Sequence, residues 1–85
     1  MDILKLRKEI NLIDKEILAT LAKRFDLIKE IKAFKQRNNL GIEDKNREKE
    51  IIDALVNANK HKEITPDLIE KIWSAIFAES KRKQQ

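Results

Sequence analysis

The chain contains one glycine, Gly41, and one proline, Pro66, in 85 residues. A β-sheet protein needs turn residues about every 8–12 positions, and this sequence has almost none to supply. The sequence therefore predicts an all-α fold, divided into helices at Gly41 and near Pro66.

The first predicted helix is too long to be covered by the rest of the chain. Its apolar residues recur at spacings of three and four, the pattern of one helical face: Ile3, Leu6, Ile10, Ile13, Ile17, Leu21, Ile28 and Ile31. A helix of about 36 residues measures roughly 54 Å, about twice the length of either remaining segment. We therefore expect a second copy of the chain to cover the rest of this face and to form an intertwined homodimer.

We expect one domain with helices at about residues 2–38, 44–59 and 65–83 of the full span 1–85. Asn38, Asn39 and Gly41 tolerate left-handed backbone conformations and are expected to end the first helix. Asp44 is the expected N-cap of the second helix. Thr65 and Pro66 are residue types preferred at the N-cap and first position of the third.

Two cations lie on the apolar face of the first predicted helix. At 100° per residue, Arg24 is within roughly 60° of Leu21 and Ile28, and Lys35 is about 20° from Arg24. A buried cation without a partner costs several kcal/mol, so we expect protein carboxylates or a ligand anion to compensate for these two. The alternative is that both long side chains reach solvent at the rim of the dimer.

The other two predicted helices also change from apolar to polar along one face. Glu48 is within about 60° of Ile51 and Leu55 on the second helix. Ser80 and Gln84 continue the apolar stripe of the third helix, although a fraying C-terminal turn is the alternative explanation for both. Polar groups that converge in an apolar cavity are typical of a ligand site. If the polar ends meet, they form a pocket that holds Arg24, Lys35, Glu48, Ser80 and Gln84.

The residue types available exclude several kinds of chemistry. The chain has no cysteine and one histidine, and it has no glycine-rich phosphate loop or pair of facing carboxylates. Zinc sites, phosphoryl transfer, hydrolysis and covalent catalysis lack their usual groups, and we expect no metal and no cofactor. Two cations and neutral donors can orient an anion and stabilise negative charge that develops on an oxygen. A unimolecular rearrangement of a carboxylate substrate needs no more.

Charged residues make up 40% of the chain, and the formal net charge of +4 favours anionic partners. Apolar runs are at most four residues long, too short for a membrane span or a signal peptide, so we expect a cytoplasmic protein without membrane partners. A basic nucleic-acid-binding module is one alternative. However, acidic residues alternate with the lysines, and few aromatic side chains are available for stacking on bases.

A purely structural coiled coil is a second alternative. It gives no reason for the presence of Arg24, Lys35 and Glu48 on apolar faces.

The spacing of these residues resembles that of the all-helical chorismate mutases. The first-helix pattern of that family is matched by Leu6-Arg7-x-x-Ile10, Asp14, Leu21-Ala22-x-Arg24 and Lys35. The second- and third-helix motifs are matched by Asp44-x-x-Arg47-Glu48 and Ser80-x-x-x-Gln84. The resemblance covers about residues 4–84 without a gap. It implies an isomerase that rearranges chorismate to prephenate on the route to phenylalanine and tyrosine.

The resemblance implies that four residues act on the charges of the substrate. Arg24 would pair with one carboxylate, and Arg7 would reach a carboxylate in the site of the other subunit. Lys35 and Gln84 would donate to the ether oxygen, which gains negative charge as the carbon–oxygen bond breaks. Some relatives carry a glutamate at this position, and a glutamate must be protonated to donate. The neutral amide of Gln84 donates at any pH, so we expect activity to extend through neutral pH here.

The resemblance places four further residues around the substrate. Glu48 would accept from the ring hydroxyl, with the backbone of Asp44 nearby. Ser80 would contact a carboxylate, and Arg47 would line the site and orient its neighbours. Isochorismate-pyruvate lyase is the alternative enzyme, because it resembles this fold and has a similar set of arginine and lysine residues. Its members usually lack the Asp-x-x-Arg-Glu arrangement that is intact here.

Overall fold

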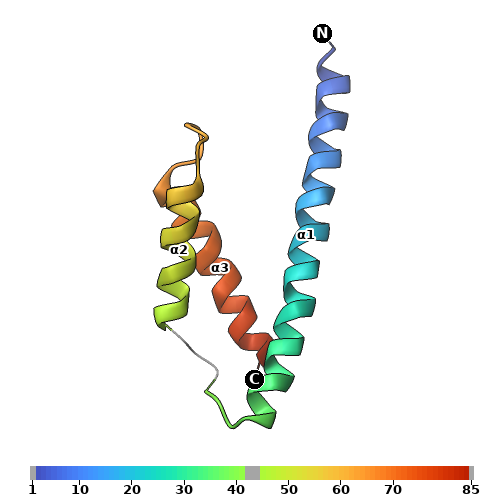
Figure 1. The fold of residues 1–85 in the computed structure, drawn as a ribbon. Coiled ribbons are helices and arrows are strands. Elements are labelled where there is room, and N and C mark those ends of the chain that lie inside the picture. The colour runs from blue at the N-terminus through green and yellow to red at the C-terminus, as the bar shows by residue number, and fades with distance from the viewer. Residues whose placement is uncertain (1, 42–44, 85) are drawn as a thin grey trace.

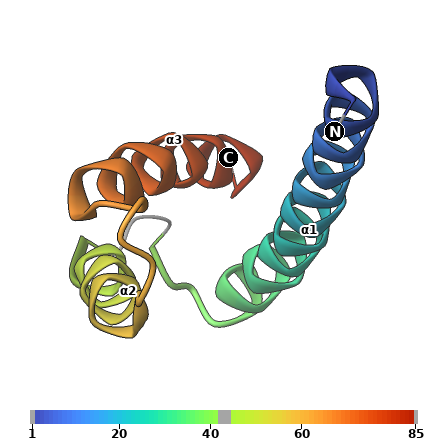
Figure 2. The same ribbon diagram turned by 90° about the horizontal axis from the view of Figure 1, so that it is seen from above.

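The computed structural model describes residues 2–41 and 45–84, and the description below is confined to them. These residues form three α-helices and no strand, which confirms the predicted all-α fold: α1 (Ile3–Arg37), α2 (Lys45–Ala58) and α3 (Pro66–Gln84). Figure 1 shows α3 packed between α2 and the C-terminal part of α1. The N-terminal half of α1 extends away from the other two helices in both views (Figures 1 and 2).

Side-chain and backbone caps define both ends of α1. Asp2 is the N-cap, and its Oδ1 accepts a hydrogen bond of 3.0 Å from the Leu4 N–H. At the other end, Asn39 has a φ of 54°, and the Leu40 N–H donates to the Lys35 carbonyl at 2.9 Å. This is the Schellman arrangement, which satisfies carbonyls of the last turn. The left-handed residue is thus Asn39, whereas Asn38 has a φ of -110° and Gly41 has no positive φ.

The connection between α2 and α3 is held by its own polar side chains. The Asn59 amide donates to the Ile64 carbonyl at 2.5 Å, and its oxygen accepts from the His61 N–H at 3.0 Å. Thr65 then caps α3, because its Oγ1 accepts from the Leu68 N–H at 3.1 Å. Pro66, which has no N–H to donate, begins the helix. The two shorter helices are therefore joined by a defined turn.

A single chain buries few of its own apolar side chains. Among the described residues, only Ile69 and Phe77 of α3 are buried apolar residues. On the apolar face of α1, Ile10 and Ile17 are 55% and 59% exposed. The radius of gyration is 16.2 Å, whereas a compact domain of this length has about 12 Å. Even so, none of the helices described is both long and apolar enough to cross a membrane.

Candidate active site

A cavity of about 240 Å³ lies where the C-terminal half of α1, the first turns of α2 and the last turns of α3 meet. Its wall is apolar at Ile28, Ile31, Ile51 and Phe77. The polar side chains that line it come from all three helices: Arg24, Lys35, Arg47, Glu48, Ser80, Lys81 and Gln84. All five residues that the sequence analysis assigned to one pocket therefore line the same cavity.

Arg24 is fixed in this cavity by α3. Its Nη1 donates to the Ser80 Oγ at 3.1 Å, and the Ser80 hydroxyl donates to the Ile76 carbonyl at 2.8 Å. The guanidinium carbon also lies 5.8 Å from the centre of the Phe77 ring, within the range of a cation–π contact. Ser80 itself is buried. The guanidinium is thus held by one neutral acceptor and one aromatic ring. No carboxylate of the described residues forms an ion pair with it.

The surroundings of Arg24 disfavour its positive charge. Burial of the guanidinium, and then the positive charge of Arg47, lower the pKa of Arg24 from its ordinary value. An arginine nevertheless stays protonated in proteins, so Arg24 keeps its positive charge in the cavity at a cost in desolvation. An anion bound beside Arg24 would offset this cost.

Lys35 and Gln84 meet across the interface of α1 and α3. The Lys35 Nζ donates to the Gln84 Oε1 at 3.2 Å. An ammonium group has only donors, so the amide must turn its oxygen toward Lys35. The amide nitrogen of Gln84 consequently keeps its two hydrogens for another acceptor. Because α3 extends to Gln84, this side chain belongs to a helical turn.

Glu48 and Arg47 stand side by side in the first turn of α2 but make different contacts. The Glu48 Oε2 lies 3.1 Å from the Lys81 Nζ on α3. Arg47 lines the cavity, yet its side chain is 64% exposed and its Nη1 lies 3.5 Å from the Glu50 Oε2. Glu48 is therefore the more enclosed of the two, with 27% of its side chain exposed.

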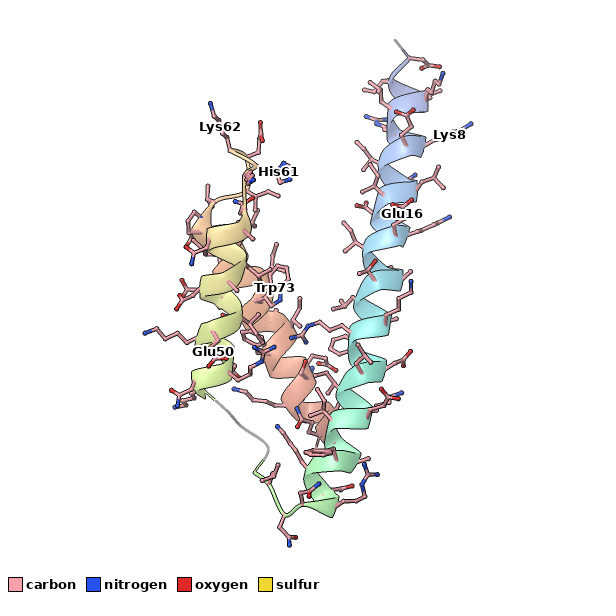
Figure 3. All side chains as sticks on the ribbon, in the orientation of Figure 1. Lys8, Glu16, Glu50, His61, Lys62 and Trp73 are labelled. Atoms are coloured by element: carbon pink, nitrogen blue, oxygen red, sulfur yellow. The ribbon has the colours of Figure 1, made fainter. Side chains whose placement is uncertain are left out.

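Arg7, a predicted site residue, does not line this cavity. Arg7 lies on the N-terminal half of α1, about 26 Å along the helix axis from Arg24. In Figure 3 neither α2 nor α3 lies beside Lys8, its neighbour in sequence. Asp44 falls outside the described residues. A single chain thus cannot bring Arg7 to its own cavity.

Lys81 also lines the cavity but is not among the predicted site residues. Lys81 lies about 60° from Gln84 around α3, at the border of the polar stripe. This position was the one feature of the sequence that could have predicted Lys81 as a site residue. His61 and Lys62, in contrast, lie in the loop between α2 and α3, at the opposite end of these helices from the last turn of α3 (Figure 3).

The cavity can bind an anion and place hydrogen-bond donors around it. It offers the cations of Arg24, Lys35 and Lys81, the amide of Gln84 and the carboxylate of Glu48. Cations and amide donors stabilise charge on oxygen, while a carboxylate accepts from a hydroxyl. This set suits a carboxylate ligand that also carries a hydroxyl group.

Comparison with known proteins matches residues 6–85 to the family described as chorismate mutase type II. A bifunctional chorismate mutase/prephenate dehydratase of Buchnera aphidicola from Schizaphis graminum is 39% identical over 93% of this chain and 20% of its own length. The corresponding Escherichia coli K12 protein is 28% identical over 98% of the chain and 22% of its own length. The chain thus spans about a fifth of the length of these curated relatives.

A solved structure is similar to nearly the whole chain. The chorismate mutase (form II) of Thermus thermophilus superposes with a TM-score of 0.90 at 30% identity. The match covers 96% of this chain and 92% of that one. With the family match over residues 6–85, the conclusion is direct: the chain belongs to the chorismate mutase type II family.

Proposed function

We propose that this chain is an isomerase that rearranges chorismate to prephenate, and that it works as a homodimer with shared sites. The observation that carries the proposal is the convergence of Arg24, Lys35, Glu48, Ser80 and Gln84 on one cavity of the expected chemistry. Family membership supports the same reaction. The reaction breaks one carbon–oxygen bond and forms one carbon–carbon bond within the substrate, so it needs no nucleophile, cofactor or proton transfer.

The first part of the mechanism is conformational. Chorismate carries two carboxylates, one on the ring and one on the flexible enolpyruvyl side chain. Arg24 would hold one of them, and Arg7 of a second copy would hold the other. Fixing both ends places the side chain over the ring before the barrier is reached, which removes entropy in advance.

The second part is electrostatic. As the carbon–oxygen bond breaks, negative charge grows on the ether oxygen. Lys35 and the Gln84 amide nitrogen would both donate to that oxygen, and their mutual hydrogen bond of 3.2 Å supports this because it sets the amide orientation in advance. Donors that bind the transition state more tightly than the ground state are the ones that raise the chemical rate.

The remaining residues would complete the binding of the substrate. Glu48 would accept from the ring hydroxyl, with the backbone of Asp44 nearby. Ser80 would contact a carboxylate while it holds Arg24, and Arg47 would line the site and orient its neighbours. The extended shape and the exposed apolar face of α1 support a second copy as the cover for that face.

Purified chain incubated with chorismate is expected to form prephenate, followed by loss of chorismate absorbance and by chromatography of the product. Parallel incubation with isochorismate tests the lyase alternative, because a lyase would release salicylate and pyruvate. Prephenate from chorismate, with no salicylate from isochorismate, supports the proposal. Salicylate as the dominant product, or no conversion of chorismate, contradicts it.

Arg7→Ala is expected to lower kcat/KM about 30-fold, because a charged hydrogen bond to a substrate carboxylate is lost. Lys8→Ala, an exposed neighbour on the same turn, serves as the control and should retain activity.

If Arg7 acts on the partner's site, co-refolding equal amounts of Arg7→Ala and Lys35→Ala chains gives mixed dimers with one intact site. About a quarter of unmodified activity should then return. Activity no greater than the average of the two parents would show that Arg7 acts elsewhere.

A further inference from the structure

The ion pair between Glu48 and Lys81 differs from the other ion pairs between described residues. Every other ion pair that joins two described residues lies within one helix, at a spacing of three or four. Glu48 and Lys81 instead join the first turn of α2 to the last turns of α3, with 27% and 33% of their side chains exposed. In the pairs Arg47–Glu50 and Lys71–Asp67, all four side chains are more than 60% exposed, whereas Lys83 and Glu79 are each 35% exposed. The contact between two helices is therefore what sets the Glu48–Lys81 pair apart.

The pair also stands in the wall of the cavity, where both side chains contribute to the lining. A glutamate has three rotatable side-chain bonds, and ordering such a side chain costs conformational entropy. The ammonium of Lys81 at 3.1 Å restricts the carboxylate before any ligand arrives. A carboxylate has about four acceptor positions, so a contact at Oε2 leaves the group able to accept from a hydroxyl as well.

We propose that Lys81 is a positioning residue of the active site, which holds the Glu48 carboxylate ready to accept from the ring hydroxyl of the substrate. This inference rests on the proposed function, because it assigns Lys81 a role in the same cavity. Glu48 touches the substrate in this scheme, whereas Lys81 acts through Glu48. The role belongs to substrate recognition, since the hydroxyl itself neither forms nor breaks a bond in the rearrangement.

Lys81→Met keeps most of the side-chain length and removes the charge, so it isolates the ion pair. KM for chorismate is expected to rise about tenfold while kcat changes less than twofold, because a hydroxyl contact made equally in ground and transition states affects binding alone. Lys81→Arg should restore most of the lost affinity, since a guanidinium also pairs with a carboxylate. Arg82→Met is the matched control, because Arg82 is exposed on the same turn and pairs with Glu79.

A double-mutant cycle separates positioning from direct contact. In a Glu48→Gln background, Lys81→Met should have almost no further effect, because the carboxylate that it orients is gone. A tenfold rise in KM in that background would overturn the inference and indicate that Lys81 binds the substrate itself. An unchanged KM in the single variant would overturn it as well, as would an equal rise in Arg82→Met.

The unmodified chain distinguishes failure of this inference from failure of the proposed function. If the unmodified chain does not convert chorismate, the proposed reaction is wrong, and the pair is judged by NMR of the lysine ammonium groups without substrate. Glu48→Gln should then speed hydrogen exchange at the Lys81 ammonium and leave that of Lys83 unchanged. Equal exchange at Lys81 in both proteins would show that Glu48 does not hold it, which would overturn the pairing.

Discussion

Replacing Lys35 with alanine is expected to lower kcat at least 100-fold. In the proposed mechanism Lys35 and Gln84 would both donate to the ether oxygen, and the ammonium of Lys35 would add a full charge to that donation. One preorganised donor at an oxygen that develops charge is worth about 3–4 kcal/mol. Single-turnover measurements with chorismate would report the chemical step directly. The variant also loses the hydrogen bond that orients the Gln84 amide. The contribution of Gln84 to the rate should therefore decrease along with that of Lys35.

Lys29→Ala is a matched control for this prediction, because Lys29 is an exposed lysine on the same helix and does not line the cavity. It should keep nearly full activity. Circular dichroism and sedimentation should show that Lys35→Ala remains helical and in the same oligomeric state as the unmodified chain. A loss of less than tenfold in a folded Lys35→Ala protein would contradict the assigned role of Lys35.

Gln84→Glu is expected to make activity strongly dependent on pH, with a loss of more than 100-fold at pH 7.5. The introduced carboxyl donates only while it is protonated, and an ordinary glutamate has a pKa of about 4.3. The ammonium of Lys35, 3.2 Å from the present amide oxygen, would lower that pKa further. Above this pKa, kcat/KM should fall about tenfold per pH unit and should recover toward acid pH. Steady-state kinetics between about pH 4.5 and about pH 8.5 would reveal the profile.

The unmodified chain should show no such fall through neutral pH, because the Gln84 amide does not titrate. Gln36→Glu introduces the same carboxyl at an exposed position of α1 and controls for the change in net charge. A flat profile for Gln84→Glu, at any level of activity, would show that residue 84 is not a donor in the rate-limiting step.

Helical periodicity predicted much of this arrangement because the information lies within single helices. The placement of Arg24 and Lys35 on an apolar stripe follows from their angles around α1, and both line the cavity. The scarcity of glycine and proline was sufficient to predict an all-α fold. These features depend on local geometry, which a sequence specifies directly.

Contacts between helices were harder to predict, since periodicity gives no relative orientation. The bond from Arg24 to the Ser80 hydroxyl and the pairing of Lys81 with Glu48 each depend on how α3 packs against its neighbours. At the end of α1, the sequence allowed a left-handed conformation at Asn38, Asn39 or Gly41, and the structure has it at Asn39. The catalytic roles themselves stay predictions until the variants are measured.

If Arg7 acts on the partner's site as proposed, the number of residues between Arg7 and Arg24 is a functional property of the chain. Each residue inserted into or deleted from α1 in this interval turns one cation by about 100° and shifts it by about 1.5 Å relative to the other. An insertion of seven residues nearly restores the angle between the two side chains around the helix axis, but it lengthens α1 by roughly 10 Å. In the proposed dimer, substitutions outside the apolar face that keep α1 helical would be tolerable across this interval, whereas a change in its length would misalign two active sites at once.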